Sequence, residues 1–140
     1  MPIAALVADA NVLLSAAIGK AALRIFTDHS VEIHVTEFNA AEVEEYLPRL
    51  ITKYGLPEPA VLLQWRVLGK RIHPLEDYEA QLATAHQVIS DRDPDDVHPL
   101  ALSMALQLPL WSNDHDLHTV GVTCYSTAQL LNLLEGESSH

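Results

Sequence analysis

Residues 3–12 read IAALVADANV, an apolar run that leads directly into Asp9. No polar residue alternates with the apolar ones before Asp9, as expected for a central strand of a parallel sheet, which is buried on both faces. In open sheets built of such strands, ligands bind outside the carboxyl ends of the strands. The stretch therefore predicts a parallel sheet with Asp9 at the edge where a functional site forms.

Short apolar runs alternate with segments of helical spacing along the rest of the chain. The expected strands are Ile3–Ala8, Glu32–Thr36, Arg71–Leu75, Leu108–Ser112 and Val120–Tyr125. The expected helices are Lys20–His29, Glu37–Tyr54, Pro57–Gly69, Glu76–Ser90, Asp96–Leu108 and Ser126–Leu134. Strands that alternate with helices predict an α/β fold, in which helices cover both faces of a parallel sheet of about five strands.

The length and composition of the chain suit one domain. Hydrophobic residues make up 49% of its 140 positions, which is enough for a core and argues against disorder. No apolar stretch reaches the roughly 18 residues that a membrane-spanning helix needs, and the N-terminus lacks the basic start of a secretory signal. The single cysteine, Cys124, has no internal disulfide partner, so a reducing cytoplasm is the expected compartment.

The charge balance is strongly acidic. Eight Lys and Arg residues stand against nineteen Asp and Glu residues, which gives a formal net charge of −11. Such a chain repels nucleic acid on average. The balance favours a basic protein partner or the binding of cations.

Three carboxylates stand beside apolar runs in distant parts of the chain. Asp9 follows IAALVA, Asp96 precedes VHPLALSMALQL, and Asp114 follows LPLWSN. An ionised group that is buried without a partner is costly, and three that converge would also repel one another. A divalent cation removes both problems, and oxygen ligands suit Mg²⁺. The pattern therefore indicates a metal site, and the metal suggests chemistry on phosphate.

Each of these positions also has an ordinary structural interpretation. Asp9 is a good helix cap, and Asn11 either orients Asp9 or a water at the metal, or stands in a turn. Asp96 begins a row with Leu100 and Met104 at four-residue intervals, so it heads an apolar stripe and does not face water.

Further polar residues flank Asp96 and Asp114 in the sequence. Asp95 is interpreted as the cap of the helix that follows it, and Asp93 as either a cap or a hydrogen-bonding partner of the ligands. The pair Asn113–Asp114 is also an ordinary turn signal. Asp116 is either another ligand or the residue that opens a helix.

The helix expected at Glu37–Tyr54 carries one more candidate acid. Its buried stripe is expected to comprise Val43, Leu47, Leu50 and Tyr54. Glu42 lies beside this stripe, on a half-buried row with Phe38 and Tyr46. Because most charged residues on helices face solvent, the spacing alone does not assign Glu42 to a site. The histidines are interpreted as ordinary polar positions, although His98 is within reach of the site from the first turn of its helix.

Three stretches of the chain resemble the PIN-domain family (PilT N-terminus), the nuclease fold of many VapC-type toxins. They are VADANVLLSA, AAEVEEYLPRL and DRDPDDVHPLALSMALQLPLWSNDHDL, and the last is the most specific. Together they span almost the whole chain. The resemblance implies a three-layer α/β/α, PIN-like domain over residues 1–135, followed by a polar tail at 136–140.

The resemblance also implies an acidic cluster that binds Mg²⁺ or Mn²⁺. The implied catalytic ligands are Asp9, Glu42, Asp96 and Asp114, with Asp116 as a further ligand and Asn11, Asp93 and Asn113 as auxiliary residues.

The function implied is metal-dependent hydrolysis of single-stranded RNA, with Lys20 and Arg24 as candidate phosphate contacts. For a toxin, an antitoxin protein is expected to place an Arg or Lys in the acidic groove, and the family implies a homodimer. Two alternatives remain open. One is a non-catalytic binding module. The other is an aspartyl phosphatase with Asp9 as nucleophile, although that chemistry generally needs a second acid where Asn11 stands.

Overall fold

A five-stranded parallel sheet forms the centre of the protein, as the sequence predicts. The computed structural model describes residues 3–89, 96–114, 117–118 and 121–138. The strand order is β3-β2-β1-β4-β5, and all pairings are parallel. The strands are β1 (Ala5–Ala8), β2 (Glu32–Thr36), β3 (Arg71–His73), β4 (Leu110–Trp111) and β5 (Cys124–Tyr125).

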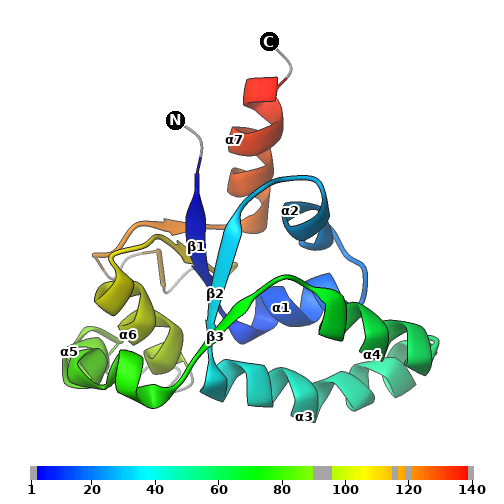
Figure 1. Ribbon diagram of the computed structural model, residues 1–140, viewed down its shortest axis with the longest axis horizontal. Coiled ribbons are helices and arrows are strands. Elements are labelled where there is room, and N and C mark those ends of the chain that lie inside the picture. The colour runs from blue at the N-terminus through cyan, green and yellow to red at the C-terminus, as the bar shows by residue number, and fades with distance from the viewer. Residues whose placement is uncertain (1–2, 90–95, 115–116, 119–120, 139–140) are drawn as a thin grey trace.

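Helices cover both faces of this sheet and complete a three-layer α/β/α fold. Successive residues of β1 point to opposite faces, so Leu6 and Ala8 pack in one apolar cluster and Val7 in the other. The first cluster includes residues of α1 (Ala10–Ala17), α2 (Leu23–Thr27), α3 (Glu37–Tyr54), α4 (Glu58–Val67) and α7 (Thr127–Ser138). The second includes residues of α5 (Leu82–Ile89) and α6 (Val97–Leu106), which lie on the left of the sheet in Figure 1.

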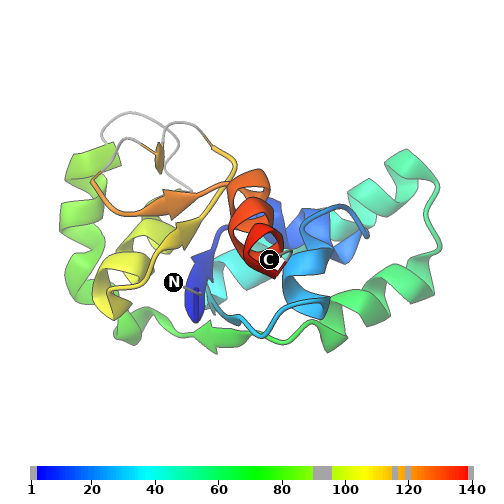
Figure 2. The ribbon, with the colours of Figure 1, turned by 90° about the horizontal axis from the view of Figure 1, so that it is seen from above.

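Helix α3 has the predicted bounds because both of its ends are marked in the sequence. The hydroxyl of Thr36 accepts a hydrogen bond from the Asn39 backbone amide at 2.9 Å, which caps the N-terminus. Gly55 ends the helix with φ at 62°, a left-handed conformation that glycine adopts without strain. One detail of the predicted stripe is wrong: Tyr54 is 50% exposed, and Ile51 is buried in its place. Figure 2 shows why, since α3 and α4 extend beyond the sheet.

Helix α1 is the main element that the sequence prediction lacks. The prediction places the first helix at Lys20–His29, where only Leu23–Thr27 is helical. The sequence of α1, ANVLLSAA, is apolar almost all round, so it carries no clear helical period. The structure buries four of its residues, Val12, Leu13, Ala16 and Ala17.

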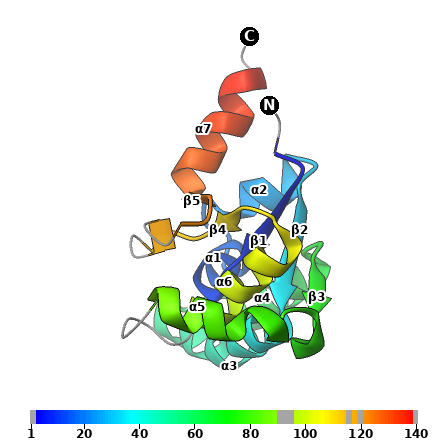
Figure 3. The same cartoon turned by 90° about the vertical axis from the view of Figure 1, so that its left-hand side faces the viewer.

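Other elements differ from the prediction at their ends. Strand β3 stops at His73, before Pro74, which has no N–H to donate to a neighbouring strand. Two short 3-10 turns, Leu75–Asp77 and Glu79–Gln81, replace the first part of the predicted helix Glu76–Ser90. Helix α7 continues past Leu134 to Ser138 and so includes residues 136–138 of the expected tail. It rises beyond the sheet at the end where both termini lie (Figure 3). Within the described ranges, no helix is both long and apolar enough for a membrane crossing.

Candidate functional site

A cavity of about 210 Å³ opens at the carboxyl ends of the central strands, where the sequence predicts a site. Three elements supply its polar lining: the start of α1, the first turns of α3, and the start of α6. These segments are far apart in the sequence. The polar side chains among the lining residues are Asp9, Asn11, Asn39, Glu42, Tyr46 and Asp96.

Asp9 caps α1, as its structural interpretation predicts, and it also lines the cavity. Its Oδ1 accepts a hydrogen bond from the Val12 amide at 2.9 Å. The side chain is only 4% exposed. Burial raises the pKa of Asp9 to about 6, even though hydrogen bonds from Ser112 and Val12 act to lower it. The carboxylate is therefore a negative charge that its hydrogen bonds do not fully compensate.

Ser112 is a site residue that the sequence prediction missed. It is fully buried at the end of β4. Its hydroxyl donates to the Asp9 carboxylate and accepts from the backbone amide of Asp114 at 3.0 Å. One O–H donor and two acceptor lone pairs permit both bonds. Ser112 thus links Asp9 to the loop that carries Asp114. The signal available in the sequence was a serine at the end of an apolar run.

Asp114 follows β4 and lies beside the cavity without being among its lining residues. Its negative charge is one of the causes that raise the pKa of Asp9. The pKa of Cys124 is raised to about 12, chiefly by burial and then by the charges of Asp9 and Asp114. Asn113 has a structural use, since its Oδ1 accepts from the Thr127 amide at 2.8 Å, at the start of α7.

Glu42 lines the cavity, and a buried asparagine holds it. The Nδ2 of Asn39 donates to Oε1 of Glu42 at 2.7 Å, and the Oδ1 of Asn39 accepts from the Thr36 hydroxyl at 2.8 Å. Asn39 is 1% exposed. Sequence reasoning missed Asn39, although Thr36 at the end of the strand is a recognisable N-cap whose side chain reaches the third residue of the helix. The half-buried row predicted for Glu42 is more open than expected: Glu42 is half-buried, but Phe38 and Tyr46 are each 39% exposed.

Asp96 occupies the N-cap position of α6, and its side chain makes no hydrogen bond that caps that helix. It lines the cavity instead. The row that it heads is buried at Leu100, as the four-residue spacing predicts. Asp95, which the sequence predicts to cap this helix, lies outside the described residues. The same is true of Asp93 and Asp116. His98, in the first turn of α6, stacks on Phe38 with ring centroids 4.0 Å apart.

The two predicted phosphate contacts do not line the cavity. Arg24 forms an ion pair with Glu135, which ties α2 to α7. Lys20 places its ammonium 5.6 Å from the centre of the Tyr54 ring.

The donor set fits a divalent cation in its chemistry. Asp9, Glu42 and Asp96 offer only oxygen atoms to one cavity, the ligand type that Mg²⁺ and Mn²⁺ prefer. A cation would also offset the cost of ionising the buried Asp9. Within the described part of the chain, no three His, Cys, Asp or Glu side chains are already arranged to hold a metal ion. The ligand set therefore stays a prediction.

Comparison with known proteins gives one result. The family model of the PIN domain matches residues 7–135, from β1 into α7. That match contains all the acids described above, but it does not single out the VapC-type toxins within the family. No curated protein matches the chain.

Proposed function

The chain belongs to the PIN-domain family, whose members are generally nucleases. We therefore propose that it is a metal-dependent endoribonuclease that acts on single-stranded RNA. One observation carries the proposal. Acidic side chains from three distant segments, Asp9, Glu42 and Asp96, line one cavity at the carboxyl edge of the sheet. Phosphodiester hydrolysis commonly relies on such a carboxylate cluster around divalent ions.

We assign Mg²⁺ or Mn²⁺ to four carboxylates, which would bind the ion directly or through water. They are Asp9, Glu42, Asp96 and Asp114, with Asp116 as a further ligand. When bound, the ion would supply Lewis-acid stabilisation of the charge that grows on the phosphate oxygens.

The chain's own residues hold two of these carboxylates, Asp9 and Glu42, before any ion binds. The Ser112 hydroxyl and the Val12 amide both hold Asp9. Asn39 holds one oxygen of Glu42 by a hydrogen bond. Side chains that are locked in this way lose little conformational entropy on binding a ligand. Asn11, at the rim of the same cavity, is suited to orient a water or a phosphate oxygen.

The acidic surface is compatible with an RNA substrate that is held mainly at the metal. Repulsion from distant surface acids is screened beyond a Debye length of about 10 Å at 0.1 M salt. Binding is then local, and the net charge of −11 limits affinity for long polyanions without preventing cleavage.

The direct test measures Mn²⁺-dependent cleavage of a mixed RNA pool. We expect activity in the wild type and background levels in Asp96→Asn and Asp114→Asn, because both changes remove charge while keeping size. Glu42→Gln should also be inactive. The matched control is Glu45→Gln, an exposed acid on the same helix, which should keep wild-type activity. Equal cleavage by all five proteins would remove the assignment.

A toxin role is a narrower form of the same proposal. The cavity acids and the net charge favour a basic antitoxin segment as the protein partner. Expression of the wild type should then arrest growth, and expression of Asp96→Asn should not. Light scattering of the purified chain tests the homodimer that the family implies.

If the wild type leaves RNA intact with Mn²⁺, the non-catalytic alternative gains support. A trapped phosphoaspartate at Asp9 would favour the phosphatase.

A further inference from the structure

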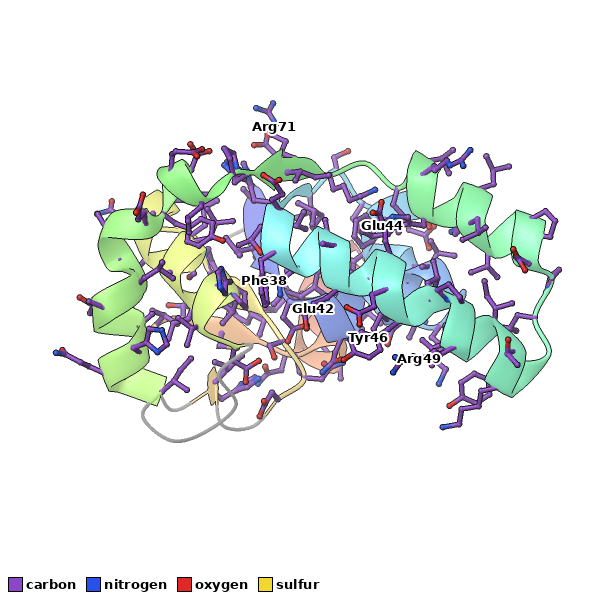
Figure 4. All side chains as sticks on the ribbon, turned by 90° about the horizontal axis from the view of Figure 1, so that it is seen from below. Phe38, Glu42, Glu44, Tyr46, Arg49 and Arg71 are labelled. Carbon is purple, nitrogen blue, oxygen red and sulfur yellow. The ribbon has the colours of Figure 1, made fainter. Side chains whose placement is uncertain are left out.

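One face of α3 carries aromatic and basic residues that lead away from the cavity. Tyr46 follows Glu42 by four residues, and Arg49, Lys53 and Tyr54 follow at spacings that keep them on one side of a helix. Figure 4 shows Glu42, Tyr46 and Arg49 in a row along one side of α3, with Glu44 on the other side. We call Tyr46, Arg49, Lys53 and Tyr54 the α3 row.

Tyr46 connects the α3 row to the candidate site. It lines the cavity together with Glu42. Its side chain is nevertheless 39% exposed, and that of Tyr54 is 50% exposed. Large aromatic side chains are usually more deeply buried than this. The two rings are eight residues apart, or about 12 Å along the helix axis.

The cations of the α3 row lie against these rings. The guanidinium carbon of Arg49 is 5.0 Å from the centre of the Tyr46 ring. The ammonium groups of Lys53 and Lys20 are 5.3 Å and 5.6 Å from the centre of the Tyr54 ring. Cation–π contacts at exposed sites are weak, so the cations remain available to an anion.

Three cations elsewhere among the described residues have other surroundings. Arg24 pairs with Glu135, and Arg71 lies 3.5 Å from Glu32. Lys70 also lies over an aromatic ring, 3.9 Å from the centre of Trp65, but that ring is buried and Lys70 donates to the carbonyl oxygens of Trp65 and Leu68. In a chain with eight basic and nineteen acidic residues, three basic residues beside two exposed tyrosines form a local exception to the charge balance.

The exposed rings and neighbouring cations match the chemistry of single-stranded nucleic acid. Unpaired bases stack on aromatic side chains, and a phosphate backbone runs beside basic ones. A duplex hides the faces of its bases and cannot use such rings. The row also begins at the cavity where the proposed reaction occurs, so a strand bound along it would enter the site.

We propose that the α3 row is a binding track for single-stranded RNA, with one base stacked on Tyr46 and its phosphate contacting Arg49. A second base is assigned to Tyr54, with Lys20 and Lys53 beside it. The inference rests on the proposed function for its choice of RNA, and it gives that function a substrate-binding surface. It assigns Tyr46 and Arg49 to binding and leaves the cleavage chemistry to the carboxylates.

The test measures binding separately from cleavage. All variants are made in the Asp96→Asn background, with Mg²⁺ present, and a short fluorescent single-stranded RNA of mixed sequence is titrated by anisotropy. We expect Tyr46→Ala to weaken binding about tenfold and Tyr46→Phe by less than about twofold, because stacking needs the ring and not the hydroxyl. Thermal unfolding of each variant verifies that it is folded.

Charge is tested by salt dependence. Arg49→Ala should weaken binding and reduce the slope of log affinity against log salt by about 0.7, the value for one phosphate contact on a single strand. Arg71→Ala is the matched control, since it removes the same charge from β3, where Figure 4 shows Arg71 well away from Tyr46 and Arg49. It should leave the slope unchanged.

Three outcomes would overturn the track. These are wild-type affinity in Tyr46→Ala, equal affinity for the matching RNA duplex, and an equal loss in Arg71→Ala and Arg49→Ala. The two proposals fail separately. If the enzyme with an intact Asp96 never cleaves RNA but Tyr46→Ala still weakens binding, the nuclease assignment falls and the track stands. If the enzyme cleaves RNA with Mn²⁺ and Tyr46→Ala binds RNA normally, the binding track falls and the nuclease assignment stands.

Discussion

The Nδ1 of His34 lies 2.8 Å from the Nε2 of His73, and these two rings join Glu32 to Asp77 across β2 and β3. The outer links are 2.7 Å, from His34 to Glu32, and 2.8 Å, from His73 to Asp77. Three hydrogen bonds need three N–H groups, which two imidazole rings supply when one ring is protonated on both nitrogens. The other ring must then stay neutral to accept.

The burial of His34 predicts a loss of stability in mild acid. Burial lowers the pKa of His34 below its usual 6.5 in the folded protein, so the unfolded chain binds more protons between the two values. The stability contributed by neutral His34 is complete above about pH 6.5 and is lost as the pH falls through that value. Urea midpoints of the wild type should fall more steeply between pH 7 and pH 5 than those of His34→Gln. Parallel profiles would contradict the prediction.

Asp9 should show the opposite dependence on pH when no metal is present. Its folded pKa of about 6 lies above the ordinary 3.8, so stability is complete below pH 3.8 and is lost as the pH rises through 6. The cost at neutral pH is about 3 kcal/mol, at 1.36 kcal/mol for each pKa unit.

Asp9→Asn provides the comparison, because Asn also caps helices well. Its advantage in unfolding free energy over the wild type should grow between pH 4 and pH 7, and added Mn²⁺ should shrink it. A constant difference between the two proteins across that range would mean that Asp9 is not the titrating group.

Asn39→Ala should impair both stability and activity. The change removes the donor to Glu42 and the acceptor for Thr36, both in a buried setting. A loss of about 1–3 kcal/mol in unfolding free energy is expected, because the Thr36 hydroxyl and the Glu42 carboxylate each lose a hydrogen bond to Asn39. Metal-dependent cleavage should fall about 10- to 100-fold, as when an outer partner of a metal ligand is removed. Asn132→Ala, at an exposed position of α7, is the control and should change neither quantity.

Cys124 should be unreactive in the folded protein. Its pKa of about 12 means that almost no thiolate exists at pH 8, and the thiolate is the nucleophile. Mass spectrometry after iodoacetamide treatment should find the thiol unmodified in buffer and modified in urea. Modification at equal rates in both conditions would show that the thiol is not shielded as described.

The order of the elements and the location of the site were predictable from the sequence, because both depend on local patterns. Apolar runs mark β1 and β2, and the cap at Thr36 together with Gly55 fixes α3 to the residue. The same kind of signal fails for α1, where the apolar residues have no visible period. Asp9 could be placed at the sheet edge because it directly follows a strand.

Partners brought from far along the chain could not be predicted. Arg24 meets Glu135 across 111 residues, and no local pattern in the sequence indicates that pair. Ser112 and Asn39 are small polar residues whose importance comes from burial next to Asp9 and Glu42, which only the packed structure defines. The pattern of apolar runs predicted Asp9, Asp96 and Asp114 as ligands, whereas Glu42 was assigned by family resemblance alone.

The central position of β1 has a consequence for how the protein is made. β1 pairs with β2 on one side and with β4, residues 110–111, on the other. A growing chain on the ribosome therefore cannot complete the middle of the sheet until β4 has been synthesised and has emerged. Until then Asp114 cannot lie beside Asp9, and the edge of the sheet lacks one of its acids.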